Sequence, residues 1–594
     1  MKSLSLISIL LLSTAAGLRA DPQLSSWMTT YAGKYARIYT TDANKTAGNS
    51  VTTWSNGTQT QSAPAYCGVQ EISYSAGWVY IRTTGLASHI MGPWYLNAGH
   101  TQVFPNQPVN RKAFYRIPRS STIGSAPATK TLTGLGVIGY FVDGVAMFDS
   151  RDGFYWNGTA EAGGGGTGYW NRDAYVNEGV TFDPGLAHQE NTGNHHYHAN
   201  PIALRYLLGD HVVFNTGNKT YSESTGPVTK HSPILGWVRD GYPIYGPYGY
   251  GSAMNPNSAI RRMVSGYVLR NGQNGTDNLS STRPTIPAWA QRVYNVAAAQ
   301  SGPPVNATYP LGRYMEDKAY LGDLGRTQGT DFDLDEYNGR FCVTPEFPNG
   351  TYAYFVAINA DGSPAYPYNI GRAFYGNPVG AAVTTLAETV TTTFQGAAAI
   401  QEEARISGIT PGSGNVALTW TSVEGGTYKV EAGSDLTNWT TLTSTQAAAG
   451  NAVETSYTEA AAGYTNARRF YKVTRTALAA YDPVSGATGG GGGGNGIVSV
   501  APATGARGST FTLTVNLDAA VNPPPVNAPV NSVTIGTTAG TNRVHTSATQ
   551  VTAQFTIPAG AATGPQTVTV VFPGPPNNPT ATVTYTLTNG FTVN

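Results

Sequence analysis

Residues Thr510–Val515, TFTLTV, and Thr567–Val571, TVTVV, alternate threonine with apolar residues. Val416–Trp420, VALTW, follows the same period earlier in the chain. Because successive side chains of an extended chain point to opposite faces, this pattern is typical of β-strands with one buried face. Gly, Asn and Ser separate the runs, as expected for turns. The C-terminal third therefore predicts two β-sandwich modules.

The composition favours β-structure over the whole chain. Its 594 residues include 71 glycines and 37 prolines, and 11% are aromatic. Glycine and proline interrupt helices, and so many aromatic residues argue against a disordered chain. We predict a mainly β protein with a large, antiparallel, β-rich N-terminal domain that contains few short helices. The best helix candidate covers residues 287–299, because Pro287 stands at its start and Gly302 follows its end.

The charge balance limits the partners. Lys plus Arg number 35, Asp plus Glu number 34, and the formal net charge is +1. Proteins that bind nucleic acid usually present a basic surface, so we expect no nucleic-acid partner.

The first residues resemble an export signal. Met1-Lys2-Ser3 precedes an apolar stretch from Leu4 to Leu18, and a small residue stands before Asp21. This order is typical of a secretory signal peptide. No later stretch has the length and apolar character of a membrane span, so we expect no transmembrane segment in the mature chain. We expect a secreted, periplasmic or cell-surface protein.

Composition also suggests the domain boundaries. A run of six glycines, 489–494, lies in a segment with the composition of a flexible linker. We predict a signal peptide at 1–20, a large domain at 21–385, a first sandwich at 400–480, a linker at 481–496 and a second sandwich at 497–594.

The chain has only two cysteines, Cys67 and Cys342. In an exported protein they can form one disulfide that joins the start of the large domain to its end. The alternative is a pair of buried thiols. We take the bridge as the first expectation.

The strongest chemical signal is the segment Phe182–Pro201, FDPGLAHQENTGNHHYHANP, which holds four of the nine histidines. If residues 195–198 are extended, His196 and His198 share one face, and His195 shares the other face with Tyr197.

A metal ion is the ligand that this arrangement favours. His188 would supply a third nitrogen, and Asp183 or Glu190 an oxygen. Imidazole suits zinc and copper, whereas a chain with so few cysteines and methionines is poorly suited to copper(I). The alternative is that these histidines are hydrogen-bonded within a turn-rich loop.

The same segment resembles a known family. His195–Pro201, HHYHANP, is similar to the signature of the YHYH-domain family of exported, mostly bacterial proteins, except that His195 replaces the first tyrosine of the tetrapeptide. Three further segments are similar to the family, and together the resemblance spans about residues 65–375. The three segments are GLASHIMGPW (85–94), SPILGWVRDGYPIYGPYG (232–249) and LDEYNGRFCVTPEFPNGTYAY (334–354). The resemblance implies a shared histidine-centred site, to which His89 is added, and implies no particular reaction.

The C-terminal modules resemble common accessory domains. Tyr428–Leu442, YKVEAGSDLTNWTTL, resembles fibronectin type III-like modules, and residues 498–508 resemble immunoglobulin-like IPT/TIG domains. The resemblance implies a role in spacing or attachment.

Three further features qualify as supporting sites. Asp240, which precedes Gly241, could accept a hydrogen bond from a ligand imidazole or cap its own turn. Tyr197, between two candidate ligands, is taken as a neighbour of the site. The alternating acids Asp331, Asp333 and Asp335 would share one face of a strand, which suits calcium, or would form an exposed face.

We therefore expect an exported protein that binds a divalent transition metal, copper or zinc, and whose partner is an unknown small molecule. An enzyme that activates water or a small oxidant is one form of this hypothesis. A non-catalytic surface or matrix protein that binds glycans or other extracellular polymers through its tyrosines and tryptophans is the alternative. A scaffold stabilised by a structural cation is the third possibility.

Overall fold

The computed structural model describes residues 21–396 and 402–594 apart from several short segments. Within the first range, residues 29–32, 57–58, 123–129 and 164–167 are not described. Within the second range, residues 405, 413, 423–425, 450–453, 461–467, 478–496, 518–527, 548 and 574–581 are not described. The predicted signal peptide and the predicted linker lie outside the described residues.

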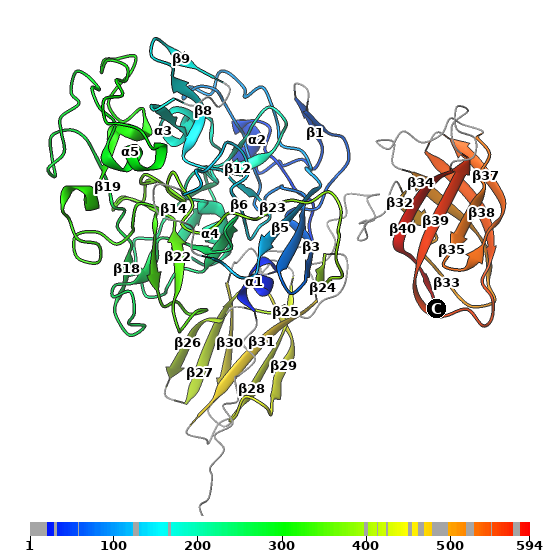
Figure 1. Cartoon of the computed structure of the whole chain (residues 1–594). Coiled ribbons are helices and arrows are strands. Elements are labelled where there is room, and N and C mark those ends of the chain that lie inside the picture. The colour runs from blue at the N-terminus through cyan, green and yellow to red at the C-terminus, as the bar shows by residue number, and fades with distance from the viewer. Residues whose placement is uncertain are drawn as a thin grey trace, which may run out of the picture.

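The protein is mainly β, as the sequence predicts, and Figure 1 shows its many short strands and few helices. The helices are α1 (Pro22–Ser25), α2 (Asp42–Ala47), α3 (Ala174–Glu178), α4 (Ile202–Leu207) and α5 (Ala288–Tyr294). The described residues also form the 3-10 helices η1 (Ser26–Met28), η3 (Gly179–Thr181), η4 (Met315–Asp317) and η5 (Leu321–Leu324). The helix expected from residue 287 is α5, and it ends early because Asn295 adopts a left-handed conformation.

An eight-stranded sheet forms the centre of the large domain. Its order is β11 (His188–Gln189), β12 (His195–Tyr197), β7 (Ala146–Met147), β6 (Gly139–Phe141), β15 (Ile234–Val238), β16 (Pro243–Tyr245), β22 (Thr351–Phe355) and β21 (Gly339–Cys342). The pairs β12–β7 and β16–β22 are parallel, and the other pairs are antiparallel. The histidine-rich segment thus lies at one edge of the largest sheet.

A second sheet of five strands belongs to the same hydrophobic core. Its order is β23 (Ala381–Ala382), β5 (Ala113–Pro118), β4 (Trp78–Thr83), β3 (Val69–Tyr74) and β24 (Thr391–Gln395). Because β24 pairs with β3, this sheet continues to Gln395, beyond the boundary expected at residue 385.

Smaller sheets complete the large domain. They are β10 (Asn171–Asp173), β8 (Arg151–Trp156) and β9 (Glu161–Ala162); β1 (Trp54–Asn56) and β2 (Gln59–Gln61); β13 (Val212–Asn215) and β14 (Thr220–Glu223); β17 (Tyr248–Tyr250) and β18 (Ile260–Arg262); β19 (Tyr267–Leu269) and β20 (Lys318–Tyr320).

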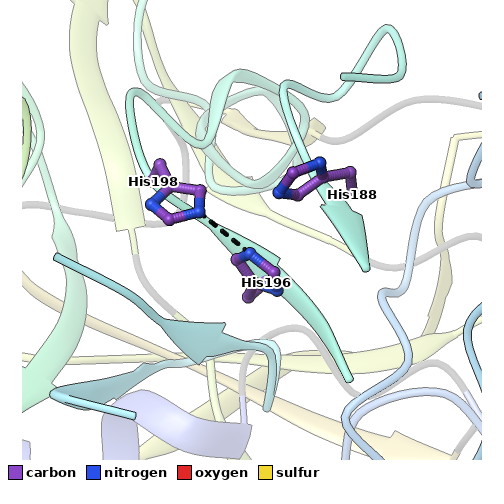
Figure 2. Close-up of side chains that lie close together, drawn as sticks. All are labelled: His188, His196 and His198. Atoms are coloured by element: carbon purple, nitrogen blue, oxygen red, sulfur yellow. Dashed lines mark hydrogen bonds between the residues drawn. The ribbon is translucent and has the colours of Figure 1, made fainter. Parts of the chain in front are cut away.

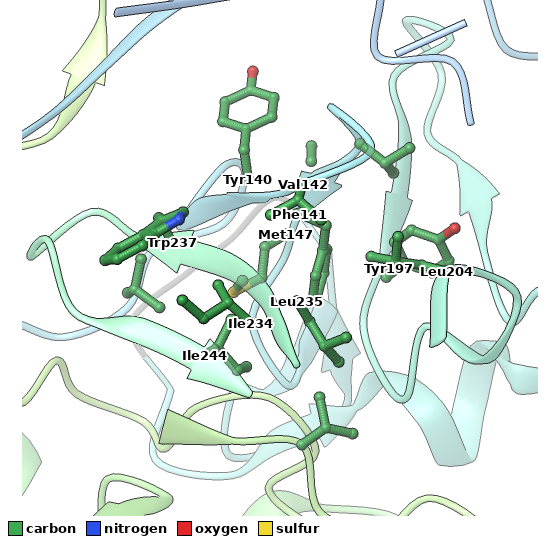
Figure 3. Close-up of a cluster of buried hydrophobic side chains, with 14 of the residues drawn as sticks. Tyr140, Phe141, Val142, Met147, Tyr197, Leu204, Ile234, Leu235, Trp237 and Ile244 are labelled. Atoms are coloured by element: carbon green, nitrogen blue, oxygen red, sulfur yellow. The ribbon is translucent and has the colours of Figure 1, made fainter. Parts of the chain in front are cut away.

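The core around β12 is apolar and aromatic. Tyr197 packs edge-on against Phe141, with ring centroids 5.3 Å apart. Figure 3 shows Tyr197 beside Leu204 of α4, among side chains from β6, β7, β15 and β16. Burial of one face of β12 in this core fixes its register, because a slip of one residue would exchange its two faces.

The C-terminal residues form two pairs of sheets, each pair with its own core. The first pair is β25 (Glu402–Glu403), β31 (Phe470–Ala477), β28 (Thr427–Gly433) and β29 (Thr440–Ala447) with β26 (Ile406–Gly412), β27 (Asn415–Thr421) and β30 (Glu454–Ala460). The second pair is β32 (Ile497–Ala501), β34 (Thr510–Leu517), β38 (Gln550–Thr556) and β37 (Thr541–Ser547) with β33 (Thr504–Gly505), β40 (Thr582–Val593), β39 (Gly564–Pro573), β35 (Ser532–Ile535) and β36 (Thr538–Ala539). Two packed sheets around one core are β-sandwiches.

The expected disulfide is wrong. Cys67 and Cys342 are both free and buried. Cys67 precedes β3 of the five-stranded sheet, whereas Cys342 ends β21 at the far edge of the eight-stranded sheet. Sequence separation carries no information on this placement, which decides whether two cysteines can be joined.

No helix among the described residues is both long enough and apolar enough to cross a membrane.

Candidate metal centre

The strands β11 and β12 bring three imidazoles together. The two strands pair in the register that sets His188 opposite His196, so these two side chains share a face. His198 lies two residues further on, on the same side as His196. Figure 2 shows the three rings turned toward one another. Their ligand atoms all lie within 4.8 Å of one another.

The outer nitrogen of each ring is already used. His196 Nδ1 lies 2.8 Å from the carbonyl oxygen of Asn194, and His198 Nδ1 lies 2.7 Å from that of Asp149. A carbonyl oxygen only accepts hydrogen bonds, so both Nδ1 atoms carry the proton. In a neutral ring, the Nε2 atom then has a free lone pair.

The third ring has the same tautomer for a similar reason. His188 Nδ1 lies 2.7 Å from Thr181 Oγ1, and that hydroxyl donates its own hydrogen to the carbonyl oxygen of Glu178. Its remaining role toward His188 is as an acceptor. All three Nε2 atoms therefore offer lone pairs to the space between the rings.

The shortest distance within the group, between two Nε2 atoms, favours a bound cation. His196 Nε2 and His198 Nε2 are 3.0 Å apart, and two lone pairs at that distance repel. A proton between them would require one imidazolium, yet burial, together with neighbouring imidazoles in the case of His196, lowers the pKa of both rings. Burial also lowers the pKa of His188 well below its usual value. The three rings are neutral at pH 7, as metal ligands must be.

Glu178 completes the group. Its Oε2 lies 3.4 Å from His198 Nε2 and 3.7 Å from His188 Nε2, and its side chain is 29% exposed, unlike those of the histidines. Burial, reinforced by the charge of Asp152, raises the pKa of Glu178 to about 8. The carboxyl group thus stands on the more accessible side of the three nitrogens.

Phenylalanines enclose the rings. Phe148 stacks on His196 with centroids 3.8 Å apart, and Phe182 packs on His188 at 4.8 Å. Phe104 contacts His188 from another direction at 5.8 Å. Such an apolar shell lowers the local dielectric constant and limits access of water to the site.

The other two predicted ligands belong to a second group. His89 and Asp183 lie with His195, and the ligand atoms of these three residues are also within 4.8 Å of one another. The single site expected from the sequence is therefore divided between the two faces of β12. Glu190, the alternative oxygen ligand, instead accepts hydrogen bonds from Thr192 and Asn194 in its own loop.

Asp240 lies away from the three imidazoles, whereas Tyr197 lies on the face predicted for it. Asp240 accepts hydrogen bonds from Tyr242 N, Gly376 N and the hydroxyl of Tyr354, so the turn-capping alternative describes it. It follows β15, which β6 and β7 separate from β12. Tyr197 lies on the face of β12 opposite His196, where its ring is 6.1 Å from that of His195.

The three alternating aspartates do not share a strand face. Residues 331–335 form turns and isolated bridges instead of a strand, so the period of two does not apply. Asp333 pairs with Arg261, Asp335 accepts from Tyr352, and Asp331 accepts from Thr327 N. They are in neither of the two ligand groups formed by the described residues.

Sequence reasoning missed Glu178 and Thr181. Both lie within ten residues before His188, but neither shows a periodic relation to the histidines. Glu178 ends α3 and Thr181 ends η3, and these two elements lead into the segment before β11. The sequence did contain one signal for these two residues, because an acidic residue and a hydroxyl residue stand shortly before the histidine cluster.

Comparison with known families supports the resemblance in part. Residues 114–366 match the family described as YHYH protein. The match includes Glu178, His188, His196 and His198, and it leaves out His89 and both C-terminal sandwiches, whose resemblance to accessory domains stays a prediction. A comparison with curated proteins finds no significant match.

Proposed function

We propose that this protein binds a divalent transition metal ion, zinc or copper(II), through the Nε2 atoms of His188, His196 and His198. The observation that carries the proposal is the 3.0 Å contact between two Nε2 atoms whose protons are held at Nδ1. A metal ion between them turns a repulsion into two bonds.

The distances suit such an ion. Zinc–nitrogen bonds of about 2.0–2.1 Å place the nitrogens of a tetrahedral site about 3.3 Å apart. The closest pair here is slightly nearer, at 3.0 Å, and all pairs are within 4.8 Å. The donors are imidazoles with a carboxyl group beside them, and no thiol or thioether is among them, which favours zinc or copper(II) over copper(I).

Glu178 supports a role in activating water. Three protein ligands with a fourth position open is the arrangement of catalytic zinc sites, where the metal lowers the pKa of bound water. Glu178 stands on the accessible side, where its carboxylate would accept a proton from bound water. A substrate would approach from this side, on which the Glu178 side chain is exposed.

The same geometry supports the metal hypothesis over a polymer-binding surface. Stacking platforms require exposed rings, but seven of the ten tryptophans are buried. The buried tryptophans are Trp27, Trp54, Trp94, Trp170, Trp237, Trp289 and Trp420.

Metal analysis of the full chain, produced without an affinity tag, tests the proposal. We expect the His196→Ala/His198→Ala variant to contain one equivalent less of metal than the wild type. The control is His100→Asn/His211→Asn, because both positions have positive φ, which asparagine tolerates, and lie in neither ligand group. Equal metal content in the wild type and the His196→Ala/His198→Ala variant would reject the proposal.

A further inference from the structure

We propose that His89, Asp183 and His195 form a second metal site, on the face of β12 opposite the first, that takes a divalent first-row ion such as zinc or iron(II). The donor set, two imidazoles and one carboxylate, differs from the three imidazoles of the first site. The proposal does not depend on the first site being occupied.

Three separate parts of the chain converge here. His195 opens β12, Asp183 lies in the turn before β11, and His89 lies in the loop after β4. His89 Nε2 is 3.8 Å from Asp183 Oδ2, which is too long for a hydrogen bond. An ion bonded to both atoms at about 2.0–2.2 Å would fit between them.

The ring nitrogens of both histidines in this group lack hydrogen-bond partners among the described residues. His89 and His195 are buried, and this applies to all four of their nitrogens. Buried polar atoms left in this state destabilise the folded protein, so they are rare in native structures. The first group differs, because there each Nδ1 is hydrogen-bonded. Two neighbouring buried rings without partners indicate a ligand bound between them.

Asp183 supplies a negative charge without a matching cation. Its Oδ2 accepts from Gly92 N at 2.7 Å, and its Oδ1 accepts from Gly185 N at 2.9 Å and Ala187 N at 3.2 Å. No lysine or arginine of the described residues forms an ion pair with it, and its side chain is fully buried. A buried carboxylate held by three N–H groups stays ionised and calls for a positive charge.

Gly185 leaves the room that His89 needs. A Cβ atom at this position would lie 2.5 Å from His89 Nε2 and 2.9 Å from His89 Cε1. The ring would have to shift from its present position beside Asp183. The absence of a side chain at residue 185 thus keeps the nitrogen of His89 facing the carboxylate.

The second site includes the residue at which this chain departs from the YHYH tetrapeptide. His195 stands where the tetrapeptide has its first tyrosine, and His89 lies outside the matched residues 114–366. The first site lies wholly within that match. A tyrosine at position 195 would offer no imidazole nitrogen, so the group of His89, Asp183 and His195 requires the histidine found here.

The test measures zinc bound by the metal-stripped full chain, by equilibrium dialysis followed by elemental analysis. We expect two equivalents for the wild type and one for each of His89→Gln and His195→Tyr, the latter restoring the tetrapeptide. If the larger tyrosine prevents folding, as judged by circular dichroism, His89→Gln decides. Two equivalents retained by folded His89→Gln would overturn the second site.

Variants of the first site separate this inference from the proposed function. The His196→Ala/His198→Ala variant should keep one equivalent, which His89→Gln in the same chain then removes. If the wild type binds one equivalent and His196→Ala/His198→Ala binds none, the second site is wrong and the first stands. If His196→Ala/His198→Ala binds as much as the wild type while His89→Gln loses metal, the second site stands and the proposed function fails.

A steric variant tests the geometry without altering a ligand. Gly185→Ala should lose one equivalent of zinc, because its methyl group displaces the ring of His89. Gly153→Ala is the control, since a Cβ there meets nothing within 4 Å, and it should bind as the wild type does. Full binding by Gly185→Ala would contradict the arrangement proposed.

Discussion

At the scale of single residues, what the first site can bind depends on which nitrogen of each imidazole carries the proton. Two of the three Nδ1 acceptors are main-chain carbonyls, of Asn194 and Asp149, which substitution cannot remove. The third is the hydroxyl of Thr181. Thr181 is therefore the one of the three acceptors at which the tautomer can be tested while every ligand stays in place.

We expect Thr181→Val to weaken metal binding at the first site by about 10–100-fold, the usual effect of losing a partner that orients a ligand. Valine keeps the shape of threonine and lacks the acceptor for His188 Nδ1–H. Competition with a chromophoric chelator measures the affinity. Thr181→Ser, which keeps the hydroxyl, should bind nearly as well as the wild type, and equal affinity of all three proteins would show that this hydrogen bond does not orient His188.

Glu178 predicts how metal affinity depends on pH. Its pKa is raised to about 8, so below that pH the metal-free protein carries a proton there that a bound cation displaces. The histidines add no such proton, because burial lowers their pKa values. Affinity should rise about tenfold per pH unit between about pH 6 and pH 7.5.

Glu178→Gln should remove this slope, since the amide does not titrate. Isothermal titration calorimetry in buffers of different ionisation enthalpy counts the protons released directly. We expect one proton fewer for the variant than for the wild type near pH 7. An unchanged slope would mean that Glu178 takes no part in binding.

At the scale of elements, the alternation of residues 195–198 was sufficient to place His196 and His198 on one face. It could not supply Glu178 or Thr181, because these depend on how α3 and η3 lead into β11. It also could not show that the opposite face carries ligands. Within residues 195–198, that face carries only His195 and Tyr197. His195 becomes part of a second group only because the loop with His89 and the turn with Asp183 lie beside it.

The prediction that Asp331, Asp333 and Asp335 share one strand face is wrong for a different reason. Side chains alternate with a period of two only in an extended segment. Residues 331–335 turn instead, so each carboxylate has a separate hydrogen-bond partner. Asp335 caps the turn before β21, where its Oδ1 accepts from Tyr337 N at 2.9 Å and Gly339 N at 3.1 Å, and it bonds the hydroxyl of Tyr352 in β22. It joins the turn to the sheet instead of holding a cation.

This role predicts a pH effect on folding. Burial raises the pKa of Asp335 to about 7, above the value near 4 of an unfolded chain. The folded state then binds the extra proton between these two values, so stability should fall as the pH rises from about 4 to about 7, by roughly 2–4 kcal/mol from this group. Urea unfolding across that range should show a smaller fall for Asp335→Asn, whereas exposed Asp331→Asn should keep the wild-type slope. Parallel curves for Asp335→Asn and the wild type would contradict the assignment.

At the scale of the whole molecule, every residue of both candidate sites lies between His89 and His198. The large domain continues to β24, which pairs with β3 and ends at Gln395. Neither ligand group includes a described residue of the C-terminal sandwiches. The sequence predicted these sandwiches from their alternation, and their strands contribute no donor to either metal site.

This separation predicts that residues 21–396 alone bind metal as the full chain does. The ion pair between Lys230 and Glu454 joins the two parts at 3.4 Å, but both side chains are about a third exposed or more, and such pairs contribute little. We expect the same number of zinc equivalents, within error, for the truncated and full chains. In calorimetry of the full chain, added zinc should stabilise only the transition that the truncated protein also shows, by up to about 4 kcal/mol for each occupied site at a thousandfold excess over Kd. Loss of zinc binding by a truncated protein that is folded by circular dichroism would show that the sandwiches shape the sites.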